Sequence, residues 1–227
     1  MICAIMQPSY LPWSGYFNLI AQADKFVFLD DAQLQKNSWH NRNRLLVNHS
    51  PHWITVPVKH KSLGQAIVDT ELDNTKNWRD KHIKLIQHTY GKHSYANDVL
   101  PICEILMDES ICNLAQLNIK IIKWFLEGLE IHTEIYLSSE MDIKGRRTER
   151  LIKILGQLNA DTYLSPVGAM EYLQIDNFMN KTTASLKFQE YEPATYEQYG
   201  NETFESHLSI VDVLANVGWY AARRYVF

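Results

Sequence analysis

The residues from Lys36 to Arg44, KNSWHNRNR, contain the densest group of side chains that could act on a ligand. Arg42 and Arg44 carry planar guanidinium groups, which bind phosphate or carboxylate through paired hydrogen bonds. Lys36 adds another positive charge to the segment. This composition predicts a site for an anionic ligand, and a solvent-exposed basic edge strand is the alternative that these residues leave open.

The same segment also carries neutral polar groups. Asn41 and Asn43 have side-chain amides that could orient a sugar or polarise a carbonyl group. His40 titrates near neutral pH, so it could act as an acid or a base. If the segment is extended, alternate residues share a face, with Ser38, His40, Arg42 and Arg44 on one side and Trp39, Asn41 and Asn43 on the other.

Two adjacent carboxylates, Asp30 and Asp31, directly follow an apolar stretch that we expect to be a strand, Lys25 to Leu29. A carboxylate at the end of a strand can hold a sugar hydroxyl, bind a cation or act as a general base. A solvated pair that caps a turn is the alternative. We predict no metal site, because the sequence has no second carboxylate cluster and no histidine box.

The opening loop from Gln7 to Tyr16, QPSYLPWSGY, joins an expected strand, Ile2 to Met6, to a short helix. In nucleotide-binding α/β folds this connection places backbone N–H groups and the positive end of a helix against a phosphate. Here Tyr10 and Trp13 could stack on a base or a sugar, and Gln7 could orient the sugar. The loop lacks the GxGxxG and GxxxxGK patterns, and packing of its aromatic residues in the core is the alternative.

Two further segments carry candidate binding residues. KGRRTER, from Lys144 to Arg150, leads into an expected helix, where Thr148 could form the cap and Arg147 would lie near the positive helix end. A charged loop before an ordinary capped helix explains this segment equally well. Ser165 ends the expected strand Thr162 to Ser165 and completes the candidates at strand ends.

The elements that position these residues follow from the pattern of apolar side chains. Further strands are expected at Leu45 to Val47, Trp53 to Val58, Thr133 to Leu137 and Ala184 to Gln189. Helices are expected at Asn77 to Tyr90, Tyr95 to Met107 (divided by Pro101), Asn113 to Leu129, Thr148 to Leu158, Gly168 to Leu173 and Ser209 to Val217.

This order of elements predicts a three-layer, mainly parallel, Rossmann-like α/β sheet. We expect one domain, residues 1–227, with a helical insertion or subdomain at about 74–129. Since the carboxyl ends of parallel strands share one edge of a sheet, the opening loop, the aspartate pair and the segment that ends at Arg44 should converge on a common hollow there.

Composition and charge narrow the class of protein. The net charge of −4 argues against non-specific binding to nucleic acid. No apolar run approaches the ~20 residues that cross a bilayer, and the N-terminus does not look like a signal peptide. Cys3, Cys103 and Cys112 are widely spaced, so we expect free thiols. These features predict a cytoplasmic protein with no nucleic-acid partner and no membrane insertion.

Several segments together resemble the WbqC-like family of bacterial proteins. The resemblance covers nearly the whole chain, through MQPSYLPWSGYF, FLDDAQLQKNSWHNRNR, WITVPV, WRDKH, SSEM, TERLI, YLSPVGAMEYL and LSIVDVLANVG. It implies a role in making or decorating a sugar of a surface polysaccharide such as O-antigen. Two positions depart from the expected pattern. His40 stands in place of a glutamine, so an obligatory base is not implied there, and Pro166 stands in place of a glycine, which should stiffen the loop after TYLS.

We expect a transferase that modifies a nucleotide-linked amino sugar, by N-acylation or a related group transfer. The catalytic candidates are Asp30, Asp31 and His40, with Asp30 or His40 deprotonating the attacking amine. The substrate-binding candidates are Gln7, Tyr10, Trp13, Lys36, Asn41, Arg42, Asn43, Arg44, Arg147, Thr148 and Ser165. The alternatives are a nucleotidyl transferase or ligase that activates a carboxylate with a nucleoside triphosphate, and a non-catalytic sugar-nucleotide-binding or scaffold protein. The sequence assigns no cofactor.

Overall fold

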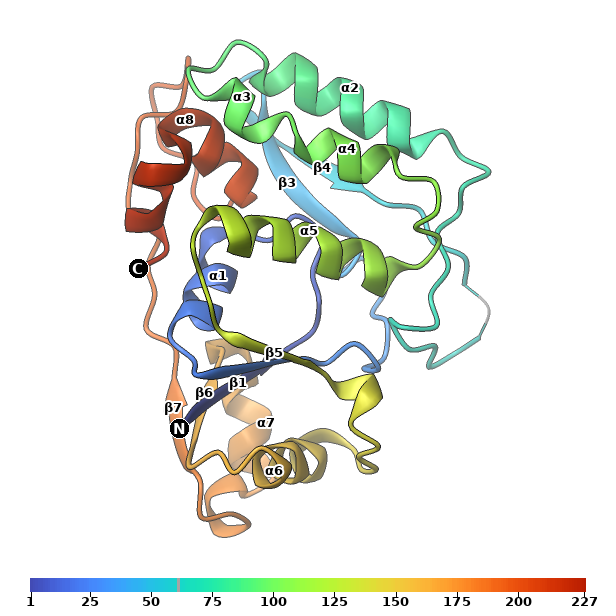
Figure 1. Ribbon diagram of the computed structural model, residues 1–227, viewed down its shortest axis with the longest axis vertical. Coiled ribbons are helices and arrows are strands. Elements are labelled where there is room, and N and C mark those ends of the chain that lie inside the picture. Colours follow the sequence, from blue (N-terminus) through green and yellow to red (C-terminus); the bar gives the residue numbers. More distant parts are fainter. Residues whose placement is uncertain (61) are drawn as a thin grey trace.

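A computed structural model describes residues 1–60 and 62–227 and shows an open α/β sheet with helices on both faces (Figure 1). Among these residues, five strands form one sheet in the order β5-β2-β1-β6-β7, and every neighbouring pair is parallel. The strands are β1 (Ile2–Met6), β2 (Lys25–Phe28), β5 (Glu134–Leu137), β6 (Thr162–Ser165) and β7 (Ser185–Phe188). The predicted three-layer, mainly parallel α/β fold is therefore confirmed.

The central strands are buried on both faces, which explains their nearly continuous apolar sequences. Successive residues of β1 pack on opposite sides, with Ala4 in one hydrophobic cluster and Cys3 and Ile5 in the other. The first side is covered by α1 (Ser14–Ala21), α5 (Leu114–Gly128) and α8 (Ile210–Ala222). The second is covered by α6 (Arg147–Gln157) and α7 (Met170–Ile175).

A hairpin, β3 (Arg42–Val47) and β4 (Ser50–Thr55), lies outside this sheet. Its turn residues Asn48 and His49 have φ angles of 48° and 64°. Two positive φ angles at the centre of a two-residue turn match the right-handed twist of the paired strands. The hairpin thus forms a separate two-stranded layer, and its first strand carries the two arginines of the segment predicted to bind a ligand.

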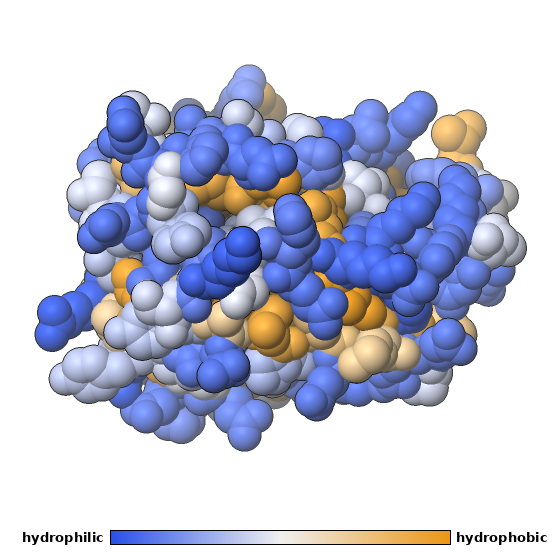
Figure 2. Space-filling model, turned by 90° about the horizontal axis from the view of Figure 1, so that it is seen from above, coloured by the Kyte–Doolittle hydropathy of each residue, from blue (hydrophilic) through white to orange (hydrophobic). Residues whose placement is uncertain are grey.

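Short helices lie above the hairpin: α2 (Trp78–Tyr90), α3 (Ala96–Val99) and α4 (Ile102–Met107) (Figure 1). Pro101 separates α3 from α4, as predicted. From above, the molecule presents mostly hydrophilic residues, and hydrophobic residues show between them and at one edge (Figure 2). In the range expected to form an insertion, α5 packs on the sheet beside α1, where the rings of Phe17 and Phe125 are 5.4 Å apart.

The extended conformation considered for Lys36 to Arg44 is found only from Arg42 onward. Residues 36–41 form turns, and the strand begins only at Arg42. Asn37 has a φ of 56°, and the Ser38 hydroxyl donates to the carbonyl oxygen of Gln35 at 2.9 Å and accepts from the N–H of His40 at 3.3 Å. These local hydrogen bonds satisfy backbone groups that an extended strand would leave for a neighbour.

The order of strands creates one place where connections diverge. The chain first adds β2 and β5 on one side of β1, then crosses to the other side and adds β6 and β7. The loop after β1 therefore leads to α1 on one face of the sheet, whereas the loop after β6 leads to α7 on the opposite face (Figure 1). A crevice opens between two such loops at the carboxyl ends of the strands, and ligands of open α/β sheets bind there.

Candidate functional site

A cavity of about 600 Å³ lies where the connections after β1 and β6 diverge. Its floor comes from the end of β1 and the residue after β2, and its opposite walls come from the opening loop and from the loop after β6. The lining residues are Ile5, Met6, Gln7, Ser9, Pro12, Trp13, Tyr16, Leu29, Gln35, Ser38, Trp39, His40, Asn43, Leu151, Tyr163, Pro166, Gly168, Ala169, Tyr172 and His207. A hollow at the carboxyl edge of the sheet is therefore present, lined by the opening loop and by part of the segment that ends at Arg44, but the aspartate pair that was expected to converge on it does not line it.

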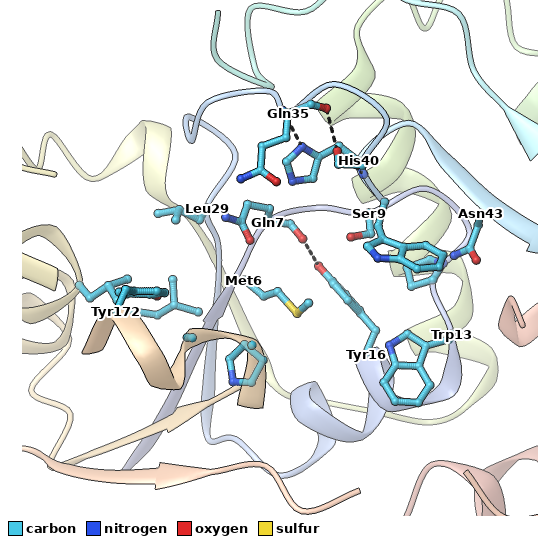
Figure 3. Close-up of a pocket in the computed structure, with 18 of the residues that line it drawn as sticks. Met6, Gln7, Ser9, Trp13, Tyr16, Leu29, Gln35, His40, Asn43 and Tyr172 are labelled. Atoms are coloured by element: carbon cyan, nitrogen blue, oxygen red, sulfur yellow. Dashed lines mark hydrogen bonds between the residues drawn. The ribbon is translucent and has the colours of Figure 1, made fainter. Parts of the chain in front are cut away.

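The walls of the cavity are mostly apolar and aromatic. Figure 3 shows Trp13 and Tyr16 on one side and Leu29 and Tyr172 on another. No Asp, Glu, Lys or Arg is found among the lining residues in the described part of the chain. Such a surface suits a ligand portion with flat apolar faces and uncharged polar groups, rather than a phosphate or a metal ion.

Three polar side chains gather at one end of the cavity: Gln7, Gln35 and His40 (Figure 3). Within the described residues, no hydrogen bond engages the side-chain amide of Gln7 or of Gln35. Each amide offers both a donor and an acceptor. This end of the cavity can therefore bind hydroxyl or amide groups of a ligand through several hydrogen bonds at once.

His40 is the titratable group of this polar end, and its surroundings keep it neutral. Its side chain is buried, and burial lowers its pKa to about 4. Nδ1 accepts a long hydrogen bond from the N–H of Gln35, at 3.4 Å, so the ring proton resides on Nε2. Among the described residues no hydrogen bond uses Nε2, so a neutral N–H donor is available to a ligand.

Asn43 shapes the opening loop. It is buried, and its Nδ2 donates to the carbonyl oxygens of Tyr10 at 3.1 Å and Leu11 at 2.8 Å. Leu11 has a φ of 44°, an uncommon conformation for a residue with a side chain. The amide of Asn43 thus holds the loop in its bent form while one edge of the residue lines the cavity.

Trp13 stands at the side of the cavity that reaches the start of α1. Its ring stacks on His207, with centroids 4.8 Å apart and an interplanar angle of 26°, and meets Tyr191 edge to face at 5.4 Å. The indole lies over Gly15, where a Cβ atom would be 2.3 Å from a ring carbon. Gly15 therefore makes room for the indole.

Tyr10 lies in the core, outside the cavity. It is fully buried, and its hydroxyl is 2.9 Å from Nδ1 of His82, whose Nε2 is 3.1 Å from the carbonyl oxygen of Thr55. Burial lowers the pKa of His82 to about 4. This buried pair joins the opening loop to α2 and the hairpin.

The aspartate pair lies outside the cavity as well. Asp30 is buried and accepts hydrogen bonds from the Ser138 hydroxyl at 3.1 Å and from the Ser139 N–H at 3.0 Å and hydroxyl at 2.6 Å. Asp31 accepts from the Ser138 hydroxyl and forms an ion pair with Arg150 of α6. The pair thus ties the end of β2 to the end of β5 and to α6.

Arg42 and Arg44 project from the outer face of the hairpin. Their guanidinium carbons lie 4.2 Å and 5.9 Å from the ring centre of Trp53. Lys36 is exposed, and Asn41 donates from its side chain to the carbonyl oxygen of Val56 at 2.9 Å. The structure therefore places Arg42, Arg44, Lys36 and Asn41 outside the cavity. The guanidinium carbon of Arg44 lies 6.0 Å from the ring centre of Trp39, a lining residue.

The candidates at α6 and β6 are separated from the cavity in different ways. Arg147 is exposed and pairs with Asp176 at 3.4 Å, and its guanidinium carbon lies 5.9 Å from the ring of Tyr172, a lining residue. The prediction that Thr148 caps α6 is wrong, because its hydroxyl donates to Asp176 at 2.8 Å. Ser165 is fully buried, and its hydroxyl donates to the carbonyl oxygen of Pro166.

Of the predicted site residues, the cavity brings together Gln7, Trp13, His40 and Asn43. Sequence reasoning missed Gln35, which reaches the cavity from a turn. Gln35 stands next to Lys36, so its amide belonged to a segment already recognised as polar. Tyr172 follows the strand TYLS by seven positions, within the expected helix Gly168 to Leu173, and it lines the cavity from α7, which begins at Met170.

The described residues form neither a metal-binding cluster nor a membrane-spanning helix. No group of three or more His, Cys, Asp or Glu side chains in the described ranges is arranged to hold a metal ion. No helix within these ranges combines the length and apolar character needed to cross a bilayer.

Comparison with known proteins identifies similar sequences. The WbqC-like protein family matches residues 7–224, nearly the whole chain. The uncharacterized protein Rv1507c of Mycobacterium tuberculosis (strain ATCC 25618 / H37Rv) is 32% identical over 218 residues, which cover 95% of this chain and 93% of that protein. No solved structure matches the chain. The matched range includes the loops after β1 and β6 and the hairpin, and thus the elements that enclose the cavity.

Proposed function

Because this chain belongs to the WbqC-like protein family, we propose that it transfers a group, such as an acyl group, to a nucleotide-linked amino sugar in bacterial surface-polysaccharide biosynthesis. Membership of this family suggests a role in polysaccharide biosynthesis. The sugar is the portion of the substrate that we assign to the cavity.

The observation that carries the proposal is the composition of the cavity. Its volume of about 600 Å³ falls within the usual range for small-molecule sites, ~300–1,000 Å³. The C–H faces of a sugar ring pack well against aromatic rings such as those of Trp13 and Tyr172. The free amides of Gln7 and Gln35 and the N–H of His40 match the hydroxyl and amine groups at the ring edge.

The proposed chemistry uses His40 as a hydrogen-bond donor. In acyl transfer, the amine lone pair forms a bond to the carbonyl carbon, and the carbonyl oxygen gains negative charge. A neutral Nε2–H beside that oxygen stabilises the charge, as donors of oxyanion holes do. The bond to the donor's leaving group then breaks, the oxygen returns its electron pair, and the proton lost by the amine ends on the leaving group. A pKa of about 4 makes His40 a weak base near neutral pH.

The charges around the cavity agree with a substrate that is neutral at one end and anionic at the other. Arg44 lies 6.0 Å from the ring of Trp39, and Arg147 lies 5.9 Å from the ring of Tyr172. Trp39 and Tyr172 both line the cavity and neither arginine does, so each guanidinium group lies beside a wall rather than inside. The sugar would enter the uncharged interior and leave the phosphates outside.

The first test is binding, followed by turnover. Thermal shift and calorimetry with UDP-N-acetylglucosamine, UDP-glucose and a dTDP-linked 4-amino-4,6-dideoxyhexose should reveal a ligand that stabilises the protein. Gln7→Leu should weaken its binding about tenfold, because one amide then loses its partners (about 1.4 kcal/mol). Gln157→Leu, on the exposed side of α6, is the matched control.

Turnover then distinguishes the enzyme from a binding protein. Incubation of the dTDP-linked 4-amino-4,6-dideoxyhexose, whose free amine can accept the group, with acyl thioesters should release the thiol and give a product heavier by the acyl group, detected by mass spectrometry. If no nucleotide sugar stabilises the protein, the proposal is wrong. Binding without any transferred group would favour the non-catalytic hypothesis, and pyrophosphate release with ATP and magnesium would favour the nucleotidyl transferase.

A further inference from the structure

Two tryptophans and two arginines form one exposed surface on the hairpin, which we call the tryptophan–arginine surface: Trp39, Trp53, Arg42 and Arg44. Arg44 pairs directly with Trp53 across the two strands, and Arg42 lies two residues before Arg44 in β3. Residues two apart in a strand share a face, so both guanidinium groups and the Trp53 ring lie on the same side. The rings of Trp39 and Trp53 are 5.2 Å apart at an angle of 41°.

The exposure and charge of this surface are not explained by folding. Trp39 is 47% exposed and Trp53 is 43% exposed, although both are large apolar side chains. In the described part of the chain, neither arginine forms an ion pair with a carboxylate, and the Nε atom of each is buried without a hydrogen-bond partner. Within the described residues, the terminal guanidinium nitrogens of Arg42 form no hydrogen bond, and Arg44 uses only Nη2. Two positive charges held against exposed rings, with terminal N–H groups that have no partner, are a feature of ligand recognition.

The surface is continuous with the cavity. Trp39 and its neighbour Ser38 line the cavity, so one side of the Trp39 residue belongs to the cavity wall while its ring meets Trp53 outside. Arg44 donates to the carbonyl oxygen of His207 at 3.3 Å, and His207 also lines the cavity. A ligand that fills the cavity can thus extend onto this surface without a gap.

We infer that the tryptophan–arginine surface binds the nucleoside diphosphate portion of the substrate, an inference that rests on the proposed function and adds the second half of its site. The base stacks on the exposed tryptophan rings, because every base presents a flat π-face to an aromatic side chain. Arg42 and Arg44 bind the diphosphate, whose oxygens accept from the free guanidinium N–H groups. The sugar, on the far side of the diphosphate, then reaches the cavity past Trp39.

A diphosphate can also be carried by a polyprenyl lipid, and the surroundings favour the nucleoside. Exposed polar residues lie close to the two tryptophans along the chain: Lys36, Asn37 and His52. A long isoprenoid chain needs a continuous apolar surface, whereas a base needs only one or two rings. The pair of tryptophans is large enough for a base and too small for a lipid chain.

The experiment measures binding of UDP and dTDP, without a sugar, by calorimetry and by quenching of tryptophan fluorescence. Trp53→Leu and Arg42→Gln should each weaken nucleoside diphosphate binding at least fivefold, which corresponds to about 1 kcal/mol. Arg42→Lys keeps the charge but loses the planar fork, so it should recover only part of the affinity. Tyr220→Leu and Arg224→Gln, exposed substitutions at the C-terminal end of α8, are the matched controls.

The outcomes separate this inference from the proposed function. If Trp53→Leu and Arg42→Gln bind UDP and dTDP as tightly as the wild type, or if the wild type binds neither, the inference is overturned, whereas binding and turnover of a nucleotide sugar that depend on Gln7 would still support the cavity. The inference is also overturned if the two variants lose binding to vesicles that contain undecaprenyl diphosphate but not to UDP. Loss of UDP and dTDP affinity in both variants, with unchanged melting temperatures, supports it.

Discussion

The carboxyl edge of the sheet holds two polar regions that look alike in the sequence but differ in the structure. Between β1 and β6, the amide of Gln7, from the loop after β1, and the amide of Gln35 and the Nε2–H of His40, from the connection between β2 and β3, face a cavity and have no partner among the described residues. At β2 and β5, the carboxylates of Asp30 and Asp31 are fully engaged by Ser138, Ser139 and Arg150. One region is available to a ligand, and the other holds the fold together.

The difference follows from the topology of the sheet. The connection after β2 and the segment after β5 come from neighbouring strands on the same side of β1, so their polar groups meet and bond to one another. The connections after β1 and β6 lead to helices on opposite faces and leave a space between them. The connection after β2 continues past the aspartate pair to the opening loop, where the Tyr10 N–H donates to the carbonyl oxygen of Trp39, and so brings Gln35 and His40 to that space. A polar residue at this edge is thus available to a ligand where it faces the space at which the direction of winding changes.

The comparison predicts that Asp30→Ala has a structural effect and leaves ligand binding intact. The change removes three hydrogen bonds to a buried carboxylate, so the free energy of unfolding should fall by about 3 kcal/mol, about 1 kcal/mol for each bond. Urea unfolding measures this loss. Asp161→Ala, whose side chain is exposed beside the N-terminus, should cost less than about 1 kcal/mol. A selective loss of affinity in folded Asp30→Ala would contradict the structural assignment.

Acid should weaken the cavity region through His40. Its pKa is about 4 in the folded chain and about 6.5 in the unfolded chain, so only the unfolded chain takes up a proton between these values. Stability is therefore complete above pH 6.5 and falls as the pH drops toward 4. His40→Gln should reduce the loss of unfolding free energy between pH 7 and 5 by about 2 kcal/mol.

Urea unfolding at the two pH values tests this dependence. His52→Gln, at an exposed position of β4, is the control and should leave the loss unchanged. A wild-type pH dependence in His40→Gln would show that His40 is not the group that responds.

Substitution of His40 also distinguishes donation from proton abstraction. His40→Ala should lower kcat/KM at least tenfold (about 1.4 kcal/mol), because the donor to the carbonyl oxygen is lost. His40→Gln should stay within about threefold of the wild type, since a glutamine N–H can replace Nε2–H. Both follow from the proposed acyl transfer and are measured by steady-state kinetics. Equal losses in the two variants would instead indicate a base.

The smallest expected effect concerns the aromatic wall. Trp13→Leu removes a ring that faces the cavity and stacks on His207, so the affinity for a nucleotide sugar should fall about fivefold, near 1 kcal/mol. Calorimetry with the ligand found for the wild type measures it, and Tyr220→Leu is the control. Unchanged affinity would place the sugar elsewhere in the cavity.

Local patterns in the sequence predict most of the elements, because their causes are local. Apolar runs in ICAIM and KFVF mark strands that are buried on both faces, and Pro101 marks the break between two helices. The turns after Lys36 could not be predicted from alternation, because the hydrogen bonds of Ser38 decide the backbone there. The hairpin strands also differ from the predicted bounds. The turn lies at Asn48 and His49, whose φ angles are positive, and strand pairing begins at Ser50 despite Pro51.

The candidate site was only partly predictable, because it depends on contacts between distant parts of the chain. Gln7 and His40 were recognised by their type and place, and both reach the cavity. Asp30 looked equally suited, but its partners at Ser138 and Ser139 are more than a hundred positions away. Nothing near Asp30 in the sequence indicates that its carboxylate is already engaged.

The absence of a side chain at Gly15 fixes the place of the Trp13 indole, which lines the cavity. Any larger side chain at position 15 would have to occupy the place of the indole, since even a Cβ would come within 2.3 Å of it. Gly15→Ala would therefore push the indole aside and obstruct the cavity. The residue at this position in each relative would then indicate the size of substrate that the relative accepts.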